Sequence, residues 1–199
     1  MNTIKEIAAR LLGRQLEATD GIDIKPAEER LGISLPQALA DFYLSVGNNK
    51  TVTSSFQRFA GINELYYTDN KLVFLEENQG VCYWGVDLIT EKVYQCTNEG
   101  GEWYYEGLAL SEFLELILYY QFAEGGYEYA ATLDDTEDIK AYLAVLDWDK
   151  VVDHNQLIIH YNHDKLIWYF TENPETVFLS TRTKIEMEEM MAEYGFVPL

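Results

Sequence analysis

The sequence predicts an α+β fold, in which an antiparallel meandering sheet is flanked by N-terminal helices and by a helix that follows the sheet. Apolar residues recur at helical spacing in residues 1–47, β-branched and aromatic runs fill residues 56–105, and an apolar helical pattern follows at residues 111–123. The connections between the β runs are short, and short connections join antiparallel neighbours. Helices that bracket such a meander indicate the α+β class.

The N-terminal part predicts three helices, each with a start or a stop signal. Thr3 and Glu6 form a capping-box pattern, in which each side chain bonds to the backbone N–H of the other residue. Pro26 and Pro36 fit the first turns of the second and third helices, where a proline removes no helical hydrogen bond. Gly47 ends the third helix. The helices are expected at residues 4–16, 25–31 and 36–46.

Four strands are expected in the meander, and the turn after the first strand is readable in detail. Asn78, Gln79 and Gly80 fit a three-residue hairpin loop with glycine at its left-handed position. The helix that follows the sheet begins at Ser111, whose hydroxyl can cap it. This helix is apolar on most sides, so we expect it to pack on the sheet. The strands are expected at residues 72–77, 81–88, 92–96 and 102–105.

The two parts of the chain differ in character. Residues 1–124 are expected to form the α+β core, and residues 125–199 an acidic α/β extension of the same sheet, packed on the same domain. The extension begins with a run that fits a strand, followed by a helix near residue 140. Its last helix opens with a second capping-box pattern, Thr183 and Glu186. Three apolar runs between these helices are expected as strands, at residues 157–162, 165–171 and 176–180.

The chain is strongly acidic. Among 199 residues, 34 are acidic and 14 are basic, which gives a formal charge of -20. Residues 111–199 alone hold eighteen acidic and five basic residues. Such a chain repels phosphate backbones and anionic membranes, so we expect it to bind neither nucleic acid nor membrane directly. A basic protein is the natural partner, although acidity that serves only solubility is the competing interpretation.

The sequence predicts a cytoplasmic protein. Its N-terminal segment is interrupted by Glu6, Arg10 and Arg14, so it lacks the apolar region of a signal peptide. No run approaches the roughly 18 uncharged apolar residues that span a membrane. Cys82 and Cys96 are too few for a disulfide framework or a metal cluster, and small buried thiols are common in strands.

Residues of catalytic type do not form a recognisable motif. Glu76 and Glu77 are neighbours on a strand, so they point to opposite faces and cannot act as an acid–base pair on one wall. The only glycine-rich turn, residues 98–107, is flanked by acidic residues that would oppose a phosphate. A Gly-x-Ser-x-Gly elbow is absent from the sequence. We therefore expect a non-enzymatic protein with no catalytic residue and no cofactor.

The three histidines, His154, His160 and His163, are close together in the sequence and could imitate a zinc site. Residues 162–164 read as a turn between two strands, so the imidazoles before and within the turn are expected to diverge. No spacing indicates a further ligand. We therefore expect no metal.

Aromatic residues are abundant, with 15 tyrosines, 9 phenylalanines and 4 tryptophans. Most are expected in the core, because alternate residues of a strand face inward. The outward-facing members could form a protein-binding patch, since tyrosine and tryptophan are favoured interface anchors.

An ordered pattern of structural residues runs through the helices and the hairpin, namely Glu29, Leu31-Gly32, Leu35-Pro36, Phe42-Tyr43, Gly47, Glu77-Asn78, Gly80, Trp84 and Asp87. In this pattern residues 18–124 resemble the SUKH superfamily, which includes a fungal cell-wall glucan-synthesis regulator and many bacterial immunity proteins. The resemblance implies a compact α+β domain whose bacterial members bind and neutralise toxins, among them nucleases and nucleic-acid deaminases. The shared positions are fold positions, so no catalytic residue is carried over. In the hairpin they imply a structural role for Glu77, Asn78, Gly80, Trp84 and Asp87.

These observations together predict a non-catalytic immunity protein that neutralises a polymorphic bacterial toxin by binding it. A basic nuclease-type toxin fits, because the groove that holds its substrate's phosphates would attract an acidic inhibitor. The alternative is a regulatory or scaffold module like the fungal relative. The free protein is expected to be a monomer. The acidic residues expected to contact the partner are Asp134, Asp135, Glu137, Asp138, Asp147, Asp149 and Asp153.

Overall fold

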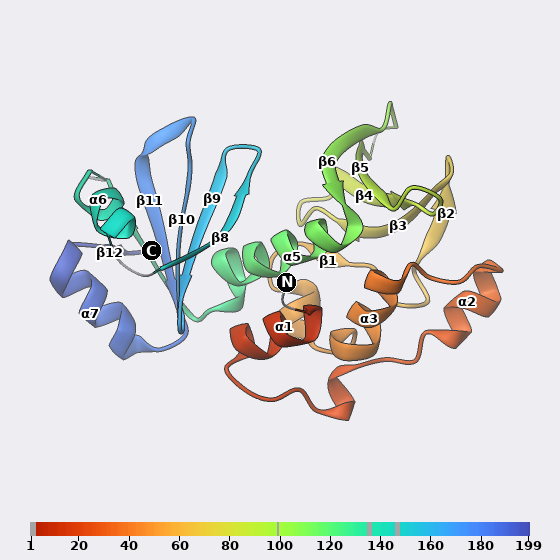
Figure 1. The fold of residues 1–199 in the computed structure, drawn as a ribbon, viewed down its shortest axis with the longest axis horizontal. Coiled ribbons are helices and arrows are strands. Elements are labelled where there is room, and N and C mark those ends of the chain that lie inside the picture. The colour runs from red at the N-terminus through yellow and green to blue at the C-terminus, as the bar shows by residue number, and fades with distance from the viewer. Residues whose placement is uncertain (1–2, 99, 135–136, 146–147) are drawn as a thin grey trace. The chain divides into compact units, whose positions relative to one another are not determined.

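The computed structural model describes residues 3–98, 100–134, 137–145 and 148–199. It confirms the α+β class, with antiparallel sheets and helices. The chain divides into two compact units, Met1–Leu118 and Tyr119–Leu199. Figure 1 shows that each unit contains its own sheet. No described helix combines the length and the apolar character that a bilayer crossing requires.

The second half of the chain does not extend the first sheet, so the expectation of one continuous sheet is wrong. Within the described ranges, the strands of the second unit pair only with one another. The hairpins of the second unit supply hydrogen-bond partners for the backbone of its strands, and its helices cover their apolar side chains. These strands therefore do not require pairing with the edge of the first sheet. A strand at Asp149–His154, which the sequence did not predict, completes this pairing.

The first unit begins with helices, and the first of them starts and stops at its capping residues. The first helix opens with the capping box of Thr3 and Glu6 and closes at Gly13, which has a φ of 64°. Its end therefore comes earlier than the sequence suggested, because the N–H of Gly13 bonds back to the last turn. The helical elements are α1 (Ile4–Leu12), η1 (Ala18–Asp20), α2 (Lys25–Leu31), α3 (Gln37–Val46), α4 (Lys50–Ser54) and α5 (Leu110–Gln121), and residues 119–121 of α5 belong to the second unit.

The first sheet is an antiparallel meander with two short additions. Its strands follow the order β1-β3-β4-β5-β6, and β2 pairs with β3. Register shifts interrupt the pairing between Val73 and Leu75 and between Lys92 and Tyr94. The strands are β1 (Arg58–Phe59), β2 (Tyr66–Thr68), β3 (Lys71–Glu76), β4 (Cys82–Asp87), β5 (Lys92–Thr97) and β6 (Tyr104–Ala109).

Helices α3 and α5 supply the aromatic core of the first unit. The ring centroid of Phe113 in α5 lies 6.0 Å from that of Phe74 and 6.1 Å from that of Trp84. In α3, Phe42 stacks on Phe59 with centroids 4.3 Å apart. These contacts place the helices on the face of the sheet to which Trp84 points.

The second unit is a six-stranded antiparallel sheet with α6 and α7 on one face, and with η2 and the last residues of α5 against the other. The strand order in its described residues is β12-β7-β11-β10-β9-β8. Its core includes Ile139, Leu143, Met187 and Met190 from the helices, packed against Leu179 and neighbouring strand residues. The elements are η2 (Phe122–Gly126), β7 (Tyr129–Leu133), α6 (Glu137–Val145), β8 (Asp149–His154), β9 (Leu157–Asn162), β10 (Lys165–Phe170), β11 (Asn173–Thr181), α7 (Lys184–Tyr194) and β12 (Val197–Pro198).

Candidate functional site

The hairpin between β3 and β4 is organised by the carboxylate of Glu77. This carboxylate accepts hydrogen bonds from two backbone N–H groups of the loop, at 2.8 and 3.2 Å. Gly80 has a φ of 71°, in the left-handed region that glycine adopts without strain. The N–H of Asn78 donates to Oε1 of Gln57 at 2.8 Å, which ties the loop to the segment before β1. Glu77 is thus engaged in the turn itself.

The two other hairpin residues also have structural partners. Trp84 is buried, and its Nε1 donates to Oε1 of Glu106 at 2.6 Å. Asp87 begins the next turn, where its Oδ1 accepts from the N–H of Thr90 at 2.9 Å and from its hydroxyl at 3.0 Å. The N–H of Thr90 is the leading cause that lowers the pKa of Asp87. Both side chains therefore stabilise the meander.

The acidic residues near the start of the second unit are spread over its sheet. Asp134 follows β7, and its Oδ1 accepts from Oγ1 of Thr176 at 3.4 Å. Asp149 and Asp153 lie on β8, where Asp153 forms an ion pair with Lys150. Three strands separate β7 from β8, a span of about 19 Å across four strand spacings. The structure therefore does not bring Asp134 together with the two residues of β8.

Of the four other acidic residues in this group, two lie within the described part of the chain. Asp135 and Asp147 lie outside the described residues. Glu137 and Asp138 lie in the first turn of α6, where negative charge favours the helix dipole, but only their backbone is described.

The histidines do not converge. His154 pairs with Leu157, and His160 lies three residues further along β9 than Leu157, so the two imidazoles belong to opposite faces of the sheet. His163 lies in the turn after β9, with a φ of 50°. Burial, with a smaller contribution from Lys150, lowers the pKa of His160. Within the described residues there is no group of three His, Cys, Asp or Glu side chains that could hold a metal.

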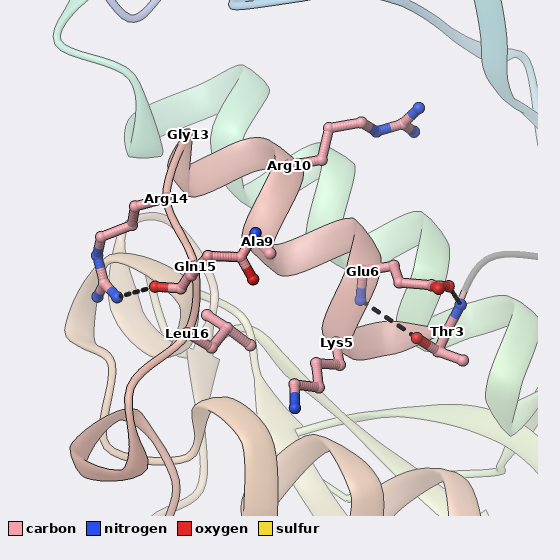
Figure 2. Close-up of a pocket in the computed structure, with 9 residues that line it drawn as sticks. All are labelled: Thr3, Lys5, Glu6, Ala9, Arg10, Gly13, Arg14, Gln15 and Leu16. Atoms are coloured by element: carbon pink, nitrogen blue, oxygen red, sulfur yellow. Dashed lines mark hydrogen bonds between the residues drawn. The ribbon is translucent and has the colours of Figure 1, made fainter.

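A broad hollow of about 800 Å³ follows α1 (Figure 2). Three basic residues line it, but the side chains of Lys5, Arg10 and Arg14 point in three different directions in Figure 2. Arg14 also donates two hydrogen bonds to the carboxylate of Asp20, at 2.8 and 2.7 Å. These cations therefore do not converge on a common anion.

One face of the first sheet carries a row of cross-strand neighbours that runs from β2 to β6. Residues paired across antiparallel strands share a face. Trp84 points to the opposite, helix-covered face, because it alternates with Tyr83 and Gly85 along β4. Tyr66 and Tyr105, at the two ends of the row, are 45% and 48% exposed. The row consists of Tyr66, Val73, Gly85, Tyr94 and Tyr105.

A second row lies beside the first, and Trp103 joins it from the segment before β6. The ring of Trp103 lies over Gly85, since a Cβ at Gly85 would be 3.1 Å from its Cη2. It meets the ring of Tyr83 edge-on, with centroids 5.3 Å apart, and its Nε1 lies 3.4 Å from Oδ2 of Asp69. The second row is Arg58, Glu76, Tyr83 and Cys96. We name the two rows with Trp103 the outer face.

The aromatic rings of the outer face already hold cations. Nζ of Lys71 lies 4.5 Å from the ring centroid of Tyr94 and 3.4 Å from Oδ2 of Asp87. Nζ of Lys92 lies 5.1 Å from the ring centroid of Tyr105. The two tyrosine rings are themselves 5.4 Å apart. The rings are thus fixed by one another and by two lysines.

A small cavity of about 100 Å³ opens at the β1 edge of the outer face. Its lining includes the rings of Tyr66 and Tyr83 and the carboxylates of Glu64 and Glu76. The guanidinium of Arg58 forms ion pairs with both carboxylates, at 3.2 Å to Glu64. The cavity therefore combines rings and carboxylates around a guanidinium of the chain itself.

Comparisons with protein-family models, with curated proteins and with solved structures find no match.

Sequence reasoning identified the aromatic meander as a source of anchors but did not find the outer face. Tyr66 and Arg58, which lie before the predicted strands, were missed, because their membership depends on the pairing of β1 and β2 with β3. The sequence does contain one signal for this face, which is the alternation of inward and outward residues along β4 and β5. It places Tyr83 and Tyr94 on the face of the sheet opposite to that of the buried Trp84.

Proposed function

We propose that this chain is a non-catalytic immunity protein, which neutralises a bacterial toxin by binding it in the cytoplasm. The observation that carries the proposal is an exposed and ordered aromatic face on a chain with a formal charge of -20. Aromatic residues supply interface anchors, and the negative field attracts a basic protein such as a nuclease. The resemblance of residues 18–124 to the SUKH superfamily supports the same function.

The absence of a catalytic role is part of the proposal. The carboxylates of Glu77 and Asp87 are engaged in turns, and the histidines lie apart. Inhibition by occupation of the toxin surface needs only complementarity, which an acidic protein offers to a groove that binds phosphates. We propose that the free protein is a monomer and forms a one-to-one complex.

The test is to co-express the chain with the toxin encoded beside its gene, and then to titrate the purified toxin with the purified chain. We expect growth of the bacterial host to be restored. Toxin activity should fall linearly to an end point at one chain per toxin, and added toxin should restore activity in proportion. Inhibition at a small fraction of the toxin concentration would instead indicate an enzyme.

A regulatory or scaffold module is the alternative function, on the resemblance to the fungal regulator. If the chain is such a module, no toxin gene lies beside its own gene. Saturating amounts of the chain then leave the activity of its partner unchanged. The titration therefore separates the two functions.

A further inference from the structure

The outer face uses its rings to bind positive charge. Lys71 lies over Tyr94, and Lys92 lies over Tyr105, at distances typical of cation–π contacts. Arg58 lies between Glu64 and Glu76 at the cavity. Each of these cations comes from the chain itself, so the face holds ammonium and guanidinium groups at three separate points.

The charge balance of the face leaves room for further cations. Counting the residues that contact the outer face together with its own members, four carboxylates stand against three cations, and each cation already contacts a carboxylate or a ring. An apolar occupant would bury these carboxylates without a new counter-charge, which is unfavourable, and an acidic occupant would be repelled. The carboxylates are Glu64, Asp69, Glu76 and Asp87, and the cations are Arg58, Lys71 and Lys92.

The face is also ordered before any partner arrives. Trp103 fits against Gly85, where no side chain intervenes, and is held by Tyr83 and by Asp69. A platform whose rings are already fixed loses little conformational entropy on binding. The exposed ring surface is thus ready to receive a cation.

From these observations we propose that the outer face binds arginine and lysine side chains of a basic protein surface. Those side chains stack on Tyr66, Trp103 and Tyr105 and pair with the neighbouring carboxylates. The inference rests on the proposed function for the nature of the partner, a basic protein. It adds the place of contact, which is the first sheet rather than the acidic residues of the second unit.

The experiment uses the full chain and a rhodamine-labelled hexa-arginine peptide, with binding followed by fluorescence anisotropy. The test variants are Trp103→Ala and Tyr105→Ala. The matched control is Tyr104→Ala, because Tyr104 is the adjacent residue of β6, is 63% exposed and pairs with Gln95 on the opposite face. Far-ultraviolet circular dichroism and melting temperature establish that each variant is folded, and Tyr105 is exposed enough for its removal to leave the fold intact.

We expect each outer-face variant to bind the peptide about fivefold more weakly, as the loss of a cation–π contact implies, and the control to change affinity by less than about twofold. At about 0.15 M salt, where the field of exposed charges is screened, an Asp149→Asn, Asp153→Asn double variant should resemble the control. Equal losses for Tyr104→Ala and Tyr105→Ala, a loss confined to the double variant, or no binding by the unaltered chain would each overturn the proposal.

This result is independent of any toxin. If the outer-face variants weaken peptide binding but the chain does not inhibit the toxin, the proposed function is wrong and the cation-binding surface is supported. If the titration succeeds and Tyr105→Ala has no effect on peptide binding, the function stands and the surface is wrong.

Discussion

The indole ring of Trp103 occupies the space that a side chain at Gly85 would take. A Cβ built at Gly85 would lie 3.1 Å from Cη2 of Trp103 and 2.9 Å from Cβ of Lys71. Glycine at this point of β4 therefore has a role that its strand position alone does not explain, since glycine weakens strands. It lets an aromatic ring lie against the sheet.

Gly85→Ala is expected to displace Trp103 and to cost about 1–2 kcal/mol of stability, the usual range for modest overpacking. Peptide binding should weaken as in Trp103→Ala, while the helix-covered face stays intact. Indole fluorescence, urea denaturation and hexa-arginine anisotropy measure the three effects. A variant that binds as tightly as the unaltered chain would show that the position of Trp103 does not matter for recognition.

Trp84 is the corresponding anchor on the opposite face. Trp84→Ala removes a buried ring from beside Phe113 and should cost about 3–5 kcal/mol of unfolding free energy. Trp84→Phe retains an aromatic ring but loses the bond to Glu106, so it should cost less, about 1–2 kcal/mol. Urea denaturation of both variants gives the comparison. Equal costs for the two would assign the whole effect to the hydrogen bond.

Local patterns in the sequence predicted most elements of the fold. The capping boxes at Thr3 and Thr183 begin helices, and the strands at residues 157–162 and 165–170 appear where apolar runs were found. Each of these signals lies within one helix or strand, so it can be read without knowing which other elements pack or pair with it. The strand β8 was missed because Asp149, Lys150 and Asp153 dilute its β-branched character.

Long-range arrangement could not be predicted in the same way. The outer face depends on strand register, and the register changes at the irregularities after Val73 and Lys92. A shift of one residue exchanges the two faces of a strand, so the members of the face were not readable from the sequence. The acidic residues from Asp134 to Asp153 are close in sequence, yet a helix intervenes and β7 and β8 lie at separate positions in the sheet.

Asp20 gives the fold a dependence on pH. The hydrogen bonds from Arg14, followed by the backbone N–H of Glu17, hold the pKa of Asp20 well below its usual range. The unfolded carboxyl has a pKa of about 3.9, so this stabilisation is complete above that pH and is lost as the pH falls toward the folded pKa. The contribution of the carboxylate should therefore decline below about pH 4.

The matched variant is Asp20→Asn, which keeps the shape and removes the charge. We expect it to lose about 2 kcal/mol of unfolding free energy at pH 7, because the donors of Arg14 and Asn49 lose a charged acceptor. At pH 2.5 the difference from the unaltered chain should be smaller. Urea denaturation at the two pH values measures it, and an equal difference at both would exclude a role for the charge.

The last prediction separates the roles of the acidic second unit and the outer face in complex formation. Asp134 and Asp149 are exposed and lie at separate positions in the second sheet, so they act on a basic partner through the field of the protein. Field effects raise the association rate, whereas short-range contacts determine how long the complex lasts. The double variant Asp134→Lys, Asp149→Lys should therefore slow association with hexa-arginine by about two- to fivefold at low salt and leave dissociation unchanged.

Tyr105→Ala should have the opposite kinetic signature, with faster dissociation and an unchanged association rate, because on our proposal this uncharged ring stacks on a side chain of the peptide. Stopped-flow anisotropy at about 0.01 M and 0.15 M salt distinguishes the two variants. The effect of the lysine substitutions should shrink at the higher salt, where the screening length falls from about 30 Å to about 8 Å. The effect of Tyr105→Ala on dissociation should persist, since the contact is shorter than either length. If the lysine variant instead accelerates dissociation at both salt concentrations, the acidic residues contact the partner directly, and the binding surface extends to the second unit.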